Sequence, residues 1–171
     1  MFIFVIYIWK VYDVTGAGGL SNIIYAPKGG DNTSIIQATI NLVPFQFVEK
    51  TFYLNVLMFV PLGFLVPFIW KNYRKIYKTV LLGGGLSLVI ELSQLITNRK
   101  TDVNDLIANT IGVLIGYMVW KLFYLCFGKY FKKETDGNNE VIWYILFSFF
   151  GLFFLCYPFW FEWNIVPLIC N

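Results

Sequence analysis

Seven polar residues sit at the edges of apolar stretches in this sequence, and their types and spacing could serve ligand binding or proton transfer. They comprise three carboxylates, one guanidinium and three side-chain amides: Asn55, Glu91, Gln94, Arg99, Asp102, Asp105 and Asn109. Paired carboxylates can exchange protons or hold Mg²⁺ or Ca²⁺, whereas a guanidinium suits phosphate and carboxylate groups. The pattern leaves both kinds of chemistry open, and it identifies no catalytic nucleophile.

The composition excludes several mechanisms. The sequence contains no histidine, so a histidine base, a Ser-His-Asp triad and a histidine-bound metal are all excluded. Its three cysteines have no CxxC spacing. We therefore expect no disulfide framework, no metal centre and no cofactor, although the acidic residues keep a metal-dependent alternative open.

These residues belong to a chain that is too apolar for an ordinary soluble domain. Of its 171 residues, 58% are hydrophobic, 20% aromatic and 13% charged, against about 25% charged in typical globular proteins. Apolar runs of about twenty residues recur, which is the length that crosses roughly 30 Å of hydrocarbon. We predict an all-α, polytopic membrane helix bundle with about five transmembrane helices and a single membrane domain over residues 1–171. A net charge of +3 argues against nucleic-acid binding.

The predicted elements follow from the apolar runs and the connections between them. They are a first helix over 1–20, an extracytoplasmic connection over 21–52, a three-helix core over 53–127, a cytoplasmic loop over 128–140 and a fifth helix over 141–161. Within the core, we expect helices at 53–70, 79–97 and 103–127.

Basic residues set the predicted orientation, because cytoplasmic loops of membrane proteins are rich in Lys and Arg. Residues 71–78 carry four such side chains and residues 129–140 carry three. Both segments are therefore expected on the cytoplasmic side. With five crossings, the N-terminus is cytoplasmic and the C-terminus extracytoplasmic.

Spacing places the polar residues on one face of each central helix, since residues three or four apart share a side. The stripes are Asn55, Phe59, Gly63 and Pro67; Gly84, Ser87, Glu91, Gln94 and Asn98; and Asp102, Asp105, Asn109, Gly112 and Gly116. Lipid offers no hydrogen-bond partners, so we expect these faces to meet around an outward-facing polar pocket. Gly112 and Gly116 form a GxxxG pair suited to close helix packing, and a homo-oligomer stays open.

Two interpretations of these polar faces are open. Buried amides can bridge helices, and Asp102 can cap the helix that follows it. Such structural roles explain Glu91 less well, because a carboxylate within the bilayer costs about 2.5–3.5 kcal/mol. We expect Glu91 to be protonated, paired with a cation or exposed to a water-filled cavity.

The order of these residues resembles the VanZ-like family of bacterial membrane proteins. The matching pieces are NLVPF at 41–45, NVLMFVPLGFLVP at 55–67, Glu91-x-x-Gln94 and Arg99-x-x-Asp102-x-x-Asp105-x-x-x-Asn109-x-x-Gly112-x-x-x-Gly116. The resemblance covers roughly residues 41–120. One departure is Asn104, where family members often carry an acid.

The resemblance implies a multi-pass protein of the bacterial plasma membrane with a role in the cell envelope. The family is named for an accessory protein associated with low-level teicoplanin resistance, and no reaction is firmly attached to it. Membrane lipids, lipid-linked envelope precursors and lipoglycopeptides are the partners it implies. Binding or handling of such an amphiphilic molecule is the favoured hypothesis. The alternatives are a membrane-embedded carboxylate-dependent enzyme acting on a lipid-linked substrate and a small lipid transporter.

Overall fold

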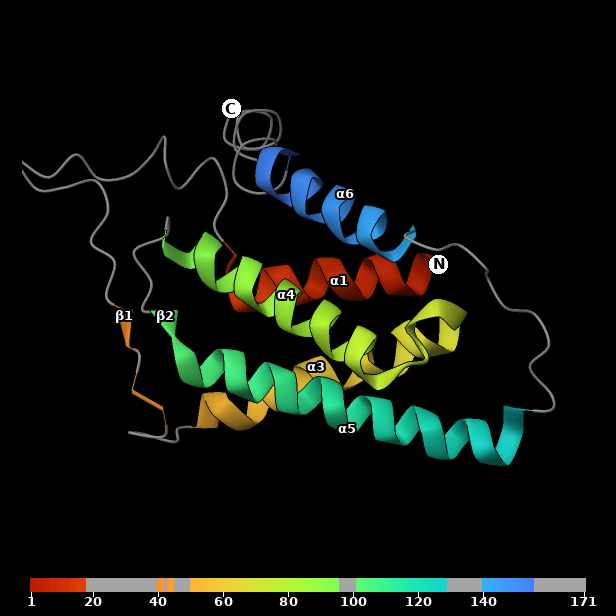
Figure 1. Cartoon of the computed structure of the whole chain (residues 1–171). Helices are drawn as coiled ribbons and strands as arrows, with labels where there is room; N and C mark the ends of the chain where they lie inside the picture. The colour runs from red at the N-terminus through yellow and green to blue at the C-terminus, as the bar shows by residue number, and fades with distance from the viewer. Residues whose placement is uncertain (18–39, 42, 45–49, 96–100, 129–139, 156–171) are drawn as a thin grey trace, which may run out of the picture. The chain divides into compact units, whose positions relative to one another are not determined.

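The computed structural model describes residues 1–17, 40–41, 43–44, 50–95, 101–128 and 140–155. Within these residues it contains five α-helices, which confirms the predicted all-α class (Figure 1). They are α1 (Phe2–Thr15), α3 (Lys50–Ile69), α4 (Ile76–Gln94), α5 (Val103–Phe127) and α6 (Glu140–Leu155). A single 3-10 turn, η1 (Lys71–Tyr73), and two paired two-residue strands, β1 (Ile40–Asn41) and β2 (Thr101–Asp102), complete the described elements.

Three helices, α3, α4 and α5, are long and apolar enough to cross a membrane. They contain 20, 19 and 25 residues, which at about 1.5 Å per residue extend over roughly 30, 28 and 37 Å. The hydrocarbon core of a bilayer is about 30 Å thick. The described parts of α1 and α6 are shorter, at 14 and 16 residues.

The first helix ends earlier than the sequence predicts, and a glycine causes the stop. Gly16 follows α1 with φ at 65°, a left-handed conformation that glycine adopts without a steric penalty. Its N–H donates to the carbonyl of Asp13 at 3.2 Å, and the N–H of Ala17 donates to that of Tyr12 at 3.1 Å. These two bonds form a Schellman motif, which satisfies the last carbonyls of the helix. α1 therefore ends at Thr15 rather than near Leu20.

A short turn joins α3 to α4. The N–H of Tyr73 donates to the carbonyl of Trp70 at 3.1 Å, and the N–H of Arg74 donates to that of Lys71 at 3.2 Å. The hydroxyl of Thr79, in the first turn of α4, donates to the carbonyl of Tyr73. The basic residues predicted as a loop therefore lie in this turn and in the first residues of α4.

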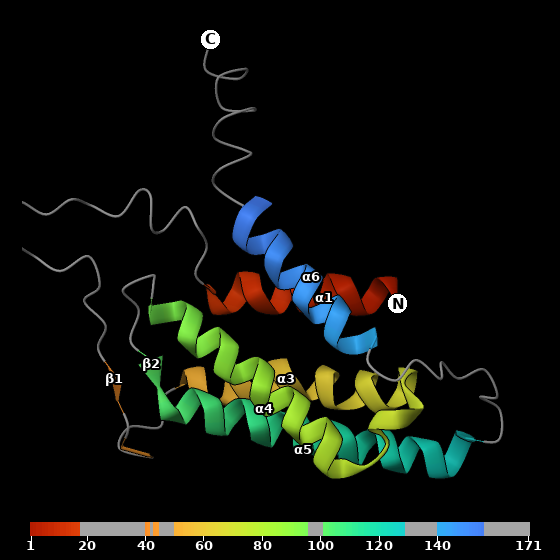
Figure 2. The same ribbon diagram turned by 45° about the horizontal axis from the view of Figure 1, so that its top comes forward.

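The described residues pack as two compact units. The first contains α3, η1, α4 as far as Val89, and α5. The second contains α1, α4 from Ile90, and α6 from Trp143. Within the first unit, α3 and α5 run side by side and make extensive contact (Figure 1, Figure 2).

Glycines let α3 and α5 approach closely. At three positions, an added Cβ would overlap a backbone carbonyl oxygen of the other helix. The contacts are Gly63 on Val113, Gly112 on Val56 and Gly116 on Val60. The GxxxG pair thus packs within one chain, so a homo-oligomer built on the same pair would compete with the contact to α3.

Within the second unit, Tyr12 joins α1 to α6. Its hydroxyl donates to the carbonyl of Ile145 at 3.4 Å. Its ring meets that of Phe149 edge to face, with the centroids 5.6 Å apart. Tyr12 is fully buried, so this aromatic contact fixes where the two helices cross.

Candidate functional site

Asp102 caps the N-terminus of α5. Its backbone is extended, with φ −123° and ψ 126°, and one carboxylate oxygen accepts the N–H of Asn104 at 2.9 Å. This bond satisfies one of the N–H groups that a helix leaves without an intrahelical partner at its start. The sequence leaves open whether Asp102 caps a helix or binds a ligand, and in the structure it caps α5.

The second carboxylate oxygen of Asp102 accepts the side-chain amide of Asn41 at 3.1 Å. Asn41 lies on β1, and its own side-chain oxygen accepts the N–H of Val43 at 3.2 Å. The amide thus ties the segment before α3 to the start of α5, next to the pairing of β1 with β2. Asn41 was not among the predicted site residues, and its signal was the NLVPF motif that it opens.

Replacing Asp102 by alanine should remove both the cap and the acceptor for Asn41. We expect the free energy of unfolding to fall by about 1–2 kcal/mol, the usual effect of losing a helix cap. Asp102→Asn keeps a capping oxygen and should lose much less stability. Denaturant titration of the purified protein in detergent measures both changes, and equal losses in the two variants would show that the cap is unimportant.

The second acidic residue, Asp105, joins α5 to α3. The side-chain amide of Asn55 donates to a carboxylate oxygen of Asp105 at 2.7 Å, and both residues are partly buried. Asp105 lies in the first turn of α5, where the helix dipole favours a negative charge. The short, charge-assisted bond therefore holds a carboxylate at a defined position beside α3.

Deeper along α5, Asn109 joins this helix to α4. Its side-chain amide donates to the hydroxyl of Ser87 at 2.8 Å, and the exposed fractions are 2% for Asn109 and 0% for Ser87. The side-chain oxygen of Asn109 is also buried, and no group in the described part of the chain donates to it. A buried acceptor without a donor costs about 1–3 kcal/mol, so this oxygen lowers the stability of the folded protein.

The cap of α5 and two polar residues within the helix thus each contact a different segment. Asp102 contacts β1, Asp105 contacts α3 and Asn109 contacts α4. The sequence pattern predicts that these residues share a face of α5. Their partners on the other segments come from the structure.

Two of the remaining predicted residues belong to the second unit. The side-chain amide of Gln94 donates to the carbonyl of Thr15, at the end of α1, at 2.8 Å. Glu91 is buried, with 5% of its surface exposed. Arg99 lies outside the described residues. The hydrogen bonds described above therefore join the predicted residues to separate partners rather than to one another, except for the pair Asn55 and Asp105.

The acids within the described ranges do not gather into a metal-binding group. No three His, Cys, Asp or Glu side chains of residues 1–17, 50–95, 101–128 and 140–155 lie close enough to hold an ion. In the first unit, the start of α5 instead holds two partly exposed carboxylates, Asp102 and Asp105, and both are hydrogen-bond acceptors. Such a set favours a ligand that carries hydrogen-bond donors.

Comparison with known protein families shows which family the chain belongs to. The model of the VanZ/LLP1 family matches residues 4–124. The chain belongs to the VanZ/LLP1 family. No curated protein and no solved structure matches it.

The VanZ/LLP1 match begins further upstream than the recognised motifs, at residue 4 rather than near 41. It takes in α1, α3, α4 and most of α5, and α6 lies beyond it. Every residue of the hydrogen-bonded pairs described above for the first unit lies inside the matched region. These pairs are therefore part of the VanZ/LLP1 domain, together with three helices that can span a membrane.

Proposed function

We propose that this VanZ/LLP1 protein binds an amphiphilic cell-envelope molecule at the N-terminal end of α5. The observation that carries the proposal is the pair of carboxylates at that end, Asp102 and Asp105, each held by an amide from another segment. An acceptor-rich surface at the end of a membrane-length helix suits the polar part of such a molecule. Its apolar part would lie along the neighbouring helices, as in other sites that combine a few fixed polar groups with an apolar surface.

The proposed location is the extracytoplasmic side of the bacterial plasma membrane. The turn between α3 and α4 and the start of α4 carry four basic residues, from Lys71 to Lys78, so the positive-inside rule assigns this turn to the cytoplasm. α5 follows α4 in the sequence, so with one crossing per helix the start of α5, which carries Asp102 and Asp105, is assigned to the outer side. An N-terminus in the cytoplasm and a C-terminus outside complete the proposed topology.

Binding is a better account of the carboxylates than catalysis. Both oxygens of Asp102 accept hydrogen bonds, from Asn104 and Asn41, and Asp105 accepts one from Asn55. A general base needs an oxygen within reach of the proton that it removes, whereas a binding surface needs acceptors in fixed positions. Lipoglycopeptides such as teicoplanin are the ligand class that we propose first. Retention of the antibiotic at this surface would lower susceptibility.

Substitution of Asp105 by asparagine should weaken teicoplanin binding about tenfold or more, because a hydrogen bond to a charged group contributes about 1.5–3 kcal/mol. The variant keeps an oxygen that can accept from Asn55, so the fold should persist. Binding of labelled teicoplanin to the full chain in lipid nanodiscs measures the effect. Asp13→Asn is the matched control, because Asp13 is exposed and pairs with Lys10.

The cellular arm compares teicoplanin susceptibility in a bacterial host that lacks the gene, carries it, or carries the Asp105→Asn form. Expression of the native form should lower susceptibility, and the variant should not. Equal affinity of Asp105→Asn and native protein in nanodiscs would refute a binding role for the carboxylate. If a glycopeptide without an acyl chain bound with the same affinity, the proposal that the ligand is amphiphilic would be refuted.

A further inference from the structure

A second charged region surrounds the turn between α3 and α4, and its charges are positive. Residues 71–78 contain four Lys or Arg, residues 121–133 contain four more, and neither stretch contains an acid. The sequence alone places both stretches on one side of a membrane. The structure adds a direct connection between them, through Arg74.

Arg74 fastens the α3–α4 turn to the C-terminal part of α5. Its guanidinium lies over the ring of Tyr124, 4.5 Å from the centroid, and 5.8 Å from that of Trp120. A guanidinium N–H donates to the Tyr124 hydroxyl at 3.2 Å, and the Tyr117 hydroxyl donates to the Arg74 carbonyl at 2.6 Å. The aromatic contacts hold the planar cation in place, so little side-chain freedom is left to lose on binding an anion.

Two lysines flank this connection and face outward. Lys75 and Lys121 are exposed, and neither side-chain ammonium makes a hydrogen bond or ion pair with the residues that the structure describes. Nearby Tyr73 is buried, and burial raises the pKa of its hydroxyl above the usual 10.0. The phenol therefore stays neutral and adds no negative charge beside the lysines.

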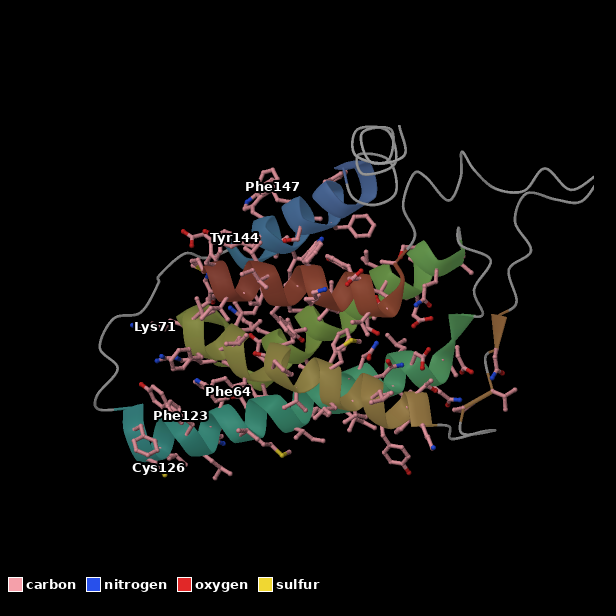
Figure 3. All side chains as sticks on the ribbon, turned by 180° about the vertical axis from the view of Figure 1, so that it is seen from behind. Phe64, Lys71, Phe123, Cys126, Tyr144 and Phe147 are labelled. Atoms are coloured by element: carbon pink, nitrogen blue, oxygen red, sulfur yellow. The ribbon has the colours of Figure 1, made fainter. Side chains whose placement is uncertain are left out.

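Apolar side chains continue directly from Lys121 along α5. Ile115, Met118 and Leu122 lie on one side of the helix and have exposed fractions of 41%, 57% and 65%. Figure 3 shows Phe123 and Cys126 of α5 at the same end of the first unit as Lys71. A positive surface thus borders an apolar surface on a helix that can span a membrane.

We propose that Arg74, Lys75 and Lys121, here named the basic end, bind the phosphate of an anionic phospholipid whose acyl chains lie along Leu122, Met118 and Ile115, toward the middle of α5. Charge complementarity selects the phosphate, and the adjoining apolar surface selects a lipid over a soluble anion. The long lysine side chains can reach the headgroup while their methylene stems stay in hydrocarbon. This site is separate from the acidic end of α5 and does not depend on the proposed function.

The test uses the full chain in detergent, titrated with phosphatidylglycerol or with phosphatidylcholine, and read by native mass spectrometry and thermal unfolding. We expect phosphatidylglycerol to bind preferentially and to raise the unfolding temperature. The double variant Lys75→Gln/Lys121→Gln should weaken that binding about twentyfold, because each lysine near an anionic headgroup contributes about a fivefold factor. Lys75→Arg/Lys121→Arg keeps the charge and should bind normally.

Lys10→Gln is the matched control, since Lys10 is an exposed lysine that belongs to the second unit and pairs with Asp13. Equal binding of the two lipids, or unchanged phosphatidylglycerol binding by the glutamine double variant, would overturn the proposal. Glycerophosphoglycerol, the headgroup without acyl chains, should have no effect at the same concentration. An equal effect would identify a soluble phosphate site and would overturn the lipid assignment.

Discussion

Replacing Gly116 by alanine should push α3 away from α5 and lower the free energy of unfolding by about 1–3 kcal/mol, the usual cost of overpacking. The new Cβ would overlap the carbonyl oxygen of Val60 and lie 3.0 Å from the Cα of Gly63. Both neighbours are backbone atoms, so no side-chain rotation can make room. The whole helix must shift, and the Gly63 and Gly112 contacts would loosen with it.

The matched control is Gly85→Ala in α4, where an added Cβ would meet nothing within 4 Å. Alanine is also favoured over glycine within a helix by about 0.5–1 kcal/mol, so this variant should be as stable as the native protein or slightly more so. Unfolding of both proteins in detergent by titration with a denaturing detergent provides the comparison. If the two variants matched in stability, close packing at Gly116 would not support the fold.

The glycines also mark what could be predicted about the helices. The apolar run and its GxxxG spacing predict a helix over 103–127, and α5 has those bounds. The spacing does not reveal which helix fills the glycine surface, because any neighbouring backbone would fit. On α3, Gly63 allows the close approach to Val113 of α5. The sequence alone shows Gly63 only as a small residue on a polar face.

Helix ends were harder to predict than helix existence. α4 begins at Ile76, three residues before the predicted start, because the basic residues of the turn can enter a helix without any stop signal. α1 ends at Thr15 because Gly16 adopts a positive φ, which an apolar run does not encode. Periodicity identifies a face that must be buried, whereas a helix end depends on a single capping conformation.

In the candidate site too, the sequence predicts which residues share a helix face but not which residues they contact. Spacing places Asp102, Asp105 and Asn109 on one side of α5, since each is three or four residues from the next. Their partners are distant in sequence: Asn41 is 61 residues from Asp102, and Asn55 is 50 residues from Asp105. Contacts over such separations depend on tertiary packing, so a single sequence cannot select them.

The double substitution Ser87→Ala/Asn109→Leu should separate a structural role of this polar face from a functional one. It removes both hydrogen-bonded partners and also the buried oxygen of Asn109, which has no donor among the described residues. Replacing both members of a buried polar pair by apolar groups is often nearly neutral or stabilising. We expect the double variant to unfold at the same free energy as the native protein, within about 1 kcal/mol, or at a higher one.

Asn109→Leu alone provides the control, because it leaves the fully buried hydroxyl of Ser87 without its donor. That single variant should be less stable than the double variant by about 1–3 kcal/mol. If the polar face serves ligand binding, the double variant should lose affinity for labelled teicoplanin while it remains folded. A double variant that is strongly destabilised but binds teicoplanin normally when folded would show instead that Ser87 and Asn109 serve only to join α4 to α5.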